Sequence, residues 1–101
     1  MKINWVRLRK RIPHLVRFKT AQYRIVWCKE LKDGDHGETT FDNKQITLSE
    51  AYGDKETVHT YIHELLHAVS EEYDVGLTEK QVRKLEKAVY WFLKEGNIFE
   101  K

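Results

Sequence analysis

The stretch that decides the fold is DKETVHTYIHELLHAVSEEY, which runs from Asp54 to Tyr73. Its apolar residues recur at spacings of three and four, which is the period of one helix face. They are Val58, Ile62, Leu65, Leu66 and Val69. Two acids, Asp54 and Glu56, stand at the start of the stretch, where the helix dipole favours negative charge. The pattern therefore predicts an amphipathic helix over this segment.

A possible metal-binding motif lies inside this helix, in the run His63-Glu64-Leu65-Leu66-His67. A separation of four residues puts both imidazoles on one helix face, close enough to share a metal ion. Glu64 is rotated about 100° from His63, so it is placed to touch a water on the metal. With five His and eleven Glu in 101 residues, about 0.03 such matches are expected by chance. The alternative is a pair of ordinary surface histidines.

The third ligand is less well determined by spacing. A catalytic zinc site usually has three protein ligands and one open position. No histidine follows His67 and Cys28 is the only cysteine, so a carboxylate is expected. The candidates are Glu71, Glu72, Glu79 and Glu86. Glu86 would lie level with the histidines in a symmetric helical hairpin, whereas a steep crossing would bring Glu79 closer, so both stay open.

The following helix is predicted from its caps and its apolar spacing. Gly76 suits a left-handed end of the first helix, and Thr78 is a good N-cap with Glu79 in the first turn. Gly96 and Asn97 are expected to stop this helix. Its buried stripe is predicted to contain Val82, Leu85, Val89 and Phe92 or Leu93.

The N-terminal half predicts one helix and three short strands. Residues 3–12 have helical apolar spacing and precede Pro13, which would end a helix. Residues 23–28 are β-branched and aromatic, and residues 38–41 and 45–48 read as a hairpin around residues 42–44. The expected class is α+β, with a small three-stranded sheet packed on a helix pair in a single domain of residues 1–101.

Composition narrows the class of protein. One cysteine excludes an intramolecular disulfide. No signal peptide is visible and no apolar run approaches the ~20 residues of a membrane helix, so a cytoplasmic location without membrane contact is expected. Charged residues make up 34% of the chain, a balance typical of proteins from hot environments.

Charge is distributed unevenly along the chain. Residues 1–29 contain nine Lys or Arg and no acid, whereas residues 30–101 carry a net charge of −7. One interpretation is that the basic run of residues 7–11 is a solvated face that pairs with the acidic part. The other is a regulatory protein that combines a zinc site with a nucleic-acid-binding N-terminal segment.

A family resemblance rests on the two predicted C-terminal helices. Its residues are Thr60-Tyr61-Ile62-His63-Glu64-Leu65-Leu66-His67-Ala68, Tyr73, Gly76, Leu77-Thr78-Glu79 and Val82-Arg83-Lys84-Leu85. Over residues 57–93 the chain resembles the minigluzincins, the smallest gluzincin metallopeptidases, and related phage-encoded proteins. The resemblance implies a minimal zincin-like domain with an active-site helix, a C-terminal glutamate helix and a sheet whose edge strand holds the substrate. The family's carboxylate matches Glu79 in preference to Glu86.

Motif and resemblance together predict a zinc-dependent endopeptidase acting on peptide or protein substrates. His63, His67 and Glu79 would hold Zn²⁺, which lowers the pKa of a bound water and polarises the peptide carbonyl. Glu64 would act as general base and pass the proton to the leaving amine. The resemblance implies a protein made in a latent form, so residues 98–101 are expected to block the cleft of the same molecule, or of a neighbour in a homodimer.

Further residues are candidates for roles around the metal. His59 lies four residues before His63 and is predicted to be an exposed helix residue, the alternative being a group that handles substrate or protons. Tyr52, Tyr61 and Tyr90 are candidates for stabilising the oxyanion, although each is equally suited to the core or its rim.

Overall fold

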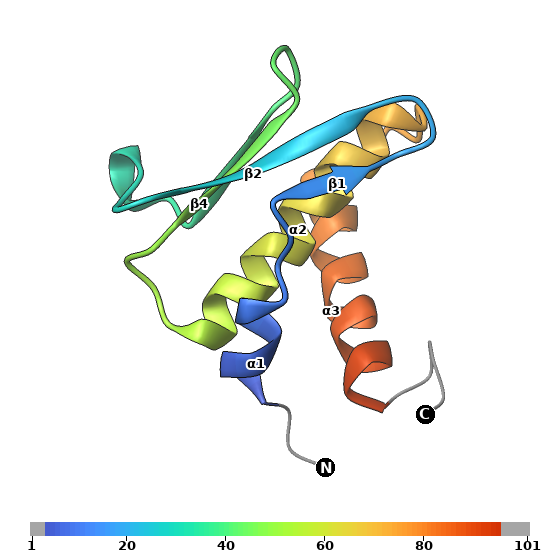
Figure 1. Cartoon of the computed structure of the whole chain (residues 1–101). Coiled ribbons are helices and arrows are strands. Elements are labelled where there is room, and N and C mark those ends of the chain that lie inside the picture. Colours follow the sequence, from blue (N-terminus) through green and yellow to red (C-terminus); the bar gives the residue numbers. More distant parts are fainter. Residues whose placement is uncertain (1–3, 96–101) are drawn as a thin grey trace.

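The computed structural model describes residues 4–95, with side chains up to Leu93. In this part of the chain the elements are α1 (Trp5–Lys10), β1 (Leu15–Arg17), β2 (Gln22–Cys28), the 3-10 turn η1 (Lys32–Gly34), β3 (Gly37–Thr40), β4 (Gln45–Ser49), α2 (Asp54–Glu72) and α3 (Glu79–Glu95). Figure 1 shows the sheet lying across one side of α2, while α3 runs back along α2. The predicted α+β class is confirmed.

Four strands form the sheet within residues 4–95, in the order β1-β2-β4-β3, so the prediction of three strands was wrong. β2 and β4 are parallel, and each pairs antiparallel with its outer neighbour. The missed strand, β1, has only three residues, and two of them, Leu15 and Arg17, are exposed. Because no apolar alternation marks it, only its pairing with β2 makes this segment a strand.

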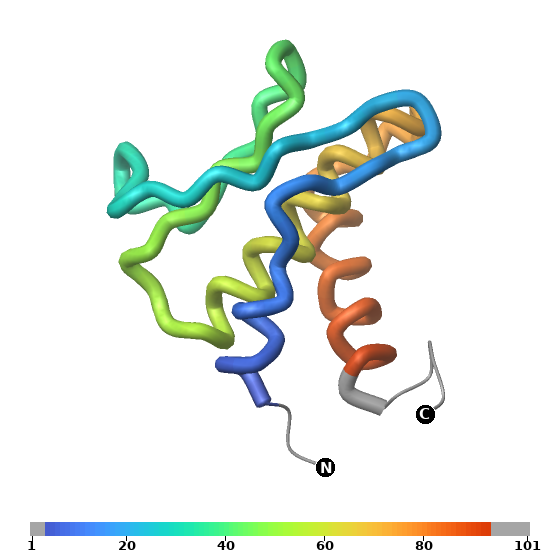
Figure 2. The backbone as a smooth tube through the Cα atoms, in the orientation of Figure 1, coloured from blue at the N-terminus to red at the C-terminus, as the bar shows by residue number. Residues whose placement is uncertain are grey.

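The β1–β2 hairpin crosses the C-terminal half of α2, as the chain path in Figure 2 shows. At its tip the rings of Phe18 and Tyr73 meet edge to face, with centroids 6.2 Å apart. The Tyr73 hydroxyl accepts a hydrogen bond from the backbone N–H of Lys19 at 3.3 Å. The hairpin is thereby tied to the end of α2.

The hydrophobic core lies between the two central strands and α2. Its members are Tyr23 and Ile25 of β2, Ile46 and Leu48 of β4, and Ala68 of α2. Along β2 the alternation of Gln22, Tyr23, Arg24 and Ile25 places the apolar side chains inside and the polar ones in solvent. Ala68 is fully buried, so this turn of α2, which also carries His67, is held against the sheet.

The turn from α2 to α3 is only partly built as the sequence predicts. The left-handed residue that ends α2 is Asp74, with φ of 53° and its N–H donated to the Glu71 carbonyl at 3.3 Å, whereas Gly76 adopts its positive φ of 73° in the loop that follows. Thr78 caps α3 reciprocally, because its Oγ1 accepts from the N–H of Gln81 at 3.2 Å and its own N–H donates to Gln81 Oε1 at 2.8 Å. This short connection brings Glu79, the first residue of α3, back beside α2.

The predicted buried stripe of α3 is only partly correct. Val82 is fully buried, but Leu85, Phe92 and Leu93 are 39%, 46% and 44% exposed. The reason is that α3 lies at the outside of the fold, with α2 as its main neighbour. The predicted stop at residues 96–97 lies outside the described residues. Within residues 4–95, no helix has the length and apolarity to cross a membrane.

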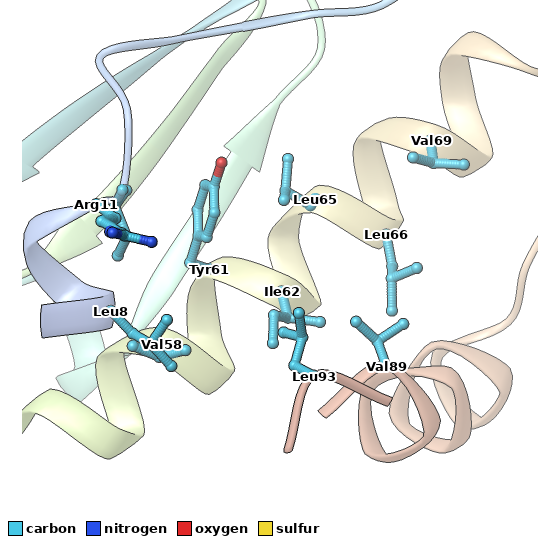
Figure 3. A pocket seen from close by; sticks show the side chains of 11 residues that line it. Leu8, Arg11, Val58, Tyr61, Ile62, Leu65, Leu66, Val69, Val89 and Leu93 are labelled. Atoms are coloured by element: carbon cyan, nitrogen blue, oxygen red, sulfur yellow. The ribbon is translucent and has the colours of Figure 1, made fainter. Parts of the chain in front are cut away.

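An apolar cavity of about 390 Å³ lies between α1, α2 and α3 (Figure 3). Val58, Ile62, Leu66 and Val89 are among its lining side chains. Tyr61 also lines this space, and burial raises its pKa to about 12. The cavity explains why Leu66 is only half-buried although it faces other helices.

A polar network joins the C-terminal end of α2 to the sheet. Glu72 Oε2 accepts hydrogen bonds from the Lys44 ammonium at 2.5 Å and from the Tyr23 hydroxyl at 2.7 Å. These two bonds, first that of Lys44, hold the pKa of Glu72 below its usual value. The folded state is therefore stabilised by ionisation of this carboxyl.

Replacing Glu72 with glutamine should remove a pH-dependent part of the stability. A depressed pKa in the folded state gives stability that is present above the unfolded-state pKa of about 4.3 and is lost as pH falls. The wild type should be more stable than Glu72→Gln near neutral pH, and the difference should shrink between about pH 5 and pH 3. Urea unfolding at several pH values measures this. The exposed neighbour Glu71, replaced in the same way, is the control, and a pH-independent difference would contradict the assignment.

Candidate metal centre

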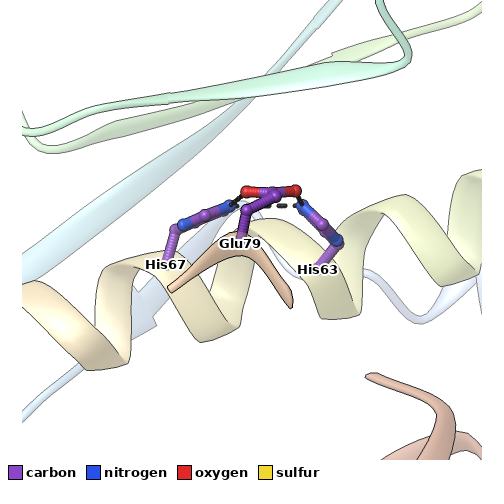
Figure 4. Close-up of side chains that lie close together, drawn as sticks. All are labelled: His63, His67 and Glu79. Carbon is purple, nitrogen blue, oxygen red and sulfur yellow. Dashed lines mark hydrogen bonds and ion pairs between the residues drawn. The ribbon is translucent and has the colours of Figure 1, made fainter. Parts of the chain in front are cut away.

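Three side chains from two helices converge at one point, as Figure 4 shows. His63 and His67, one turn apart on α2, direct their Nε2 atoms toward each other at 3.2 Å. Glu79 of α3 closes the group, with Oε1 2.8 Å from His63 Nε2 and Oε2 3.0 Å from His67 Nε2. These three residues could hold a metal ion.

The separations agree with the dimensions of a zinc site. Ligand atoms about 2.0–2.2 Å from a tetrahedral zinc lie roughly 3.3 Å from one another. The two Nε2 atoms lie 3.2 Å apart, close to that value, and one ligand atom from each of the three residues lies within 4.8 Å of the others. Two imidazole lone pairs and a carboxylate repel one another unless a proton or a cation lies between them. The donor set, two nitrogens and one oxygen, also matches the preference of zinc.

The charge of Glu79 is favoured by its neighbours. Burial raises the pKa of its carboxyl, but the positive charges of His63, His67 and Arg83 outweigh this and hold the pKa below its usual value. Arg83 lies one turn further along α3, with Nε 3.5 Å from Glu79 Oε1. The carboxylate is therefore ionised and available as a ligand at neutral pH.

Glu64 lies beside this group without joining it. Its side chain is buried, at 8% exposure, and its Oε1 accepts a hydrogen bond from Thr39 Oγ1 at 2.7 Å. Oε2 makes no hydrogen bond within the described residues. Strand β3 can approach α2 this closely because Gly37 has no side chain, since a Cβ there would lie 2.6 Å from Thr60 Cγ2. β3 therefore positions the carboxylate of Glu64.

Glu86 contacts His63 at Nδ1, the ring nitrogen that does not face His67 and Glu79. Its Oε1 lies 2.9 Å from His63 Nδ1, and its Oε2 lies 3.1 Å from His59 Nδ1. A carboxylate at Nδ1 fixes the imidazole tautomer that leaves Nε2 free for a metal. The two glutamates left open by spacing thus occupy different places, with Glu79 at the converging Nε2 atoms and Glu86 behind His63.

A cavity of about 390 Å³ opens over this cluster. Its walls come from α2, from α3 and from the loop that precedes β3. Four carboxylates line it, those of Asp35, Glu64, Glu79 and Glu86, against one arginine, Arg83. Because acidic side chains outnumber basic ones in this lining, it favours a cation.

Other residues predicted from sequence lie elsewhere. Glu72 belongs to the network with Lys44 and Tyr23, and Glu71 is exposed. None of Tyr52, Tyr61 and Tyr90 lines the cavity over the cluster within the described part of the chain. Residues 98–101, the predicted blocking segment, lie outside the described residues.

Sequence reasoning missed three contacts and predicted the wrong exposure for one residue. Thr39 reaches Glu64 across 25 positions of sequence, and Glu86 reaches two histidines across 23 and 27, distances at which no local pattern is informative. His59 was predicted to be exposed, yet its side chain is only 24% exposed because aromatic rings surround it.

In comparisons with known proteins, no family model, curated protein or solved structure matches this chain.

Proposed function

We propose that this protein is a zinc-dependent peptidase whose metal ligands are His63, His67 and Glu79. The observation that carries the proposal is the convergence of two Nε2 atoms and a carboxylate within 2.8–3.2 Å of one another. A bound zinc ion would supply a Lewis acid that polarises a carbonyl and lowers the pKa of water. Three protein ligands leave one coordination position for this chemistry.

Glu64 is the general base in this proposal. Its carboxylate follows His63 directly in α2 and lines the same cavity as His63 and Glu79. Thr39 holds Oε1, which leaves Oε2 to accept a proton from the attacking water. Glu64 would then return that proton to the leaving nitrogen, so it acts in both halves of the reaction.

An extended peptide is the substrate class that the surroundings favour. β3 is an edge strand of the sheet, and Gly37 at its start lines the cavity. An edge strand has unpaired backbone groups that can pair with an extended segment. A peptide bound along β3 would pass beside Glu64, since Thr39 of the same strand contacts that carboxylate.

Metal content and peptide cleavage test this function together. The purified full chain should bind one equivalent of zinc and cleave an unfolded protein substrate. Removal of zinc with a chelator should abolish cleavage, and added zinc should restore it. A wild-type protein that holds no zinc at equimolar metal would refute the metal site. A zinc-loaded protein that cleaves no peptide in a broad library would refute the peptidase.

A second candidate function uses the basic N-terminal segment. Of the basic side chains in residues 4–29, Arg9 forms an ion pair with Asp54 at 3.1 Å, while Arg7, Lys10 and Arg11 lie exposed. Within the part of the chain whose side chains are described, the acidic residues therefore neutralise little of this charge. Salt-dependent binding of duplex DNA by a zinc-loaded chain without peptidase activity would support the regulatory alternative.

A further inference from the structure

His59 links the group of His63, His67 and Glu79 to the N-terminal helix α1. It lies one turn before His63 on α2, and its Nδ1 is 3.1 Å from Glu86 Oε2. The other oxygen of Glu86 is 2.9 Å from His63 Nδ1. One carboxylate thus bridges two imidazoles, and both of its oxygens are engaged.

Aromatic rings from two other helices hold the His59 ring. The Tyr90 ring of α3 lies 4.6 Å from it and the Trp5 ring of α1 lies 5.7 Å from it, between centroids. Trp5 and Tyr90 also stack on each other at 5.4 Å, with an interplanar angle of 10°. His59 is consequently fixed by three helices rather than by α2 alone.

One feature of this packing is unfavourable for a histidine. Its Nε2 is buried and has no hydrogen-bond partner among the described residues. A buried polar atom without a partner costs free energy, so an aromatic ring without nitrogen would suit the packing better. The feature that distinguishes histidine here is the Nδ1–H, which can donate to Glu86.

We propose that His59 is a positioning residue for the metal centre. Clamped by Trp5 and Tyr90, it donates Nδ1–H to Glu86 and so holds that carboxylate against His63 Nδ1. Glu86 then keeps the His63 proton on Nδ1, which leaves Nε2 free for the metal. The inference rests on the proposed metal site, but it does not depend on peptidase activity.

Two substitutions of His59 separate positioning from packing. His59→Phe keeps a ring between Trp5 and Tyr90 but removes the donor to Glu86. His59→Asn removes the ring but retains a side-chain N–H near the place of Nδ1. Zinc affinity is measured by competition with a chromophoric chelator. It should fall about 10-fold in His59→Phe, the lower end of the loss typical when a residue that orients a metal ligand is replaced. His59→Asn should lose less affinity although it loses more thermal stability.

A double-mutant cycle tests the route through Glu86. If His59 acts through that carboxylate, adding His59→Phe to Glu86→Gln should cost no further zinc affinity. His14→Phe, at an exposed histidine, is the matched control and should bind zinc like the wild type. Additive losses of zinc affinity in the double variant would overturn the proposal, and so would wild-type affinity in His59→Phe. It would also be overturned if His59→Asn, the less stable of the two His59 variants, bound zinc more weakly than His59→Phe. A wild type without zinc refutes the metal site itself, whereas a zinc-loaded but inactive wild type refutes only the peptidase.

Discussion

Glu64→Gln should strongly reduce peptide cleavage and leave zinc binding unchanged, if Glu64 is the general base. Glutamine has nearly the same shape, and its amide oxygen can keep the 2.7 Å hydrogen bond from Thr39. The amide cannot accept a proton from water at neutral pH. A loss of about 10²–10⁴ in kcat is expected, which corresponds to roughly 3–5 kcal/mol of transition-state stabilisation.

The measurement is kcat/KM on a fluorogenic peptide, with zinc content determined on the same samples. Glu71→Gln is the matched control, because it makes the same change on an exposed turn of the same helix. Full activity in the control and none in Glu64→Gln would support the role of the buried carboxylate. Equal cleavage by both variants would remove Glu64 from the mechanism while leaving the metal site intact.

Glu79→Gln is the second substitution with a large expected effect, this time on metal affinity. It replaces the anionic member of the cluster with a neutral amide, which is a poor ligand for zinc. The loss of zinc affinity should exceed the 10- to 100-fold typical for replacing a group that hydrogen-bonds a metal ligand. The stability of the metal-free protein should change little, because Glu79 is half exposed and its contacts with His63, His67 and Arg83 are those of a partly solvated carboxylate.

Glu86→Gln is the natural comparison for this variant. Both substitutions are conservative and lie two turns apart on α3, but Glu86 contacts Nδ1 of His63 rather than the converging Nε2 atoms. Zinc affinity, measured by chelator competition, should therefore fall further in Glu79→Gln than in Glu86→Gln. The reverse order would assign the ligand role to Glu86.

Much of the helical architecture was predictable because its determinants are local. The period of apolar residues in α2, the left-handed Gly76 and the N-cap Thr78 each depend on neighbours within a few positions. The sheet was less predictable. The three-residue β1 carries no apolar alternation of its own and becomes a strand only through its register with β2, where Val16 faces Tyr23.

The surroundings of the cluster could not be predicted for a related reason. The contacts of Thr39 with Glu64 and of Glu86 with His59 join residues more than 20 positions apart. Their existence depends on how closely β3 and α3 approach α2, which is set by packing such as the absence of a side chain at Gly37. No spacing rule contains that information.

By itself the sequence determined that His63 and His67 share one face of a helix and that Glu64 lies beside them, because a spacing of four residues fixes these directions. It also limited the candidates for a third ligand to carboxylates. Only the tertiary structure decided which of Glu79 and Glu86 lies at the two Nε2 atoms, because their distances from the histidines depend on how α3 leaves the turn at residues 73–78. That path places the first residue of α3 at the Nε2 atoms and Glu86 behind them.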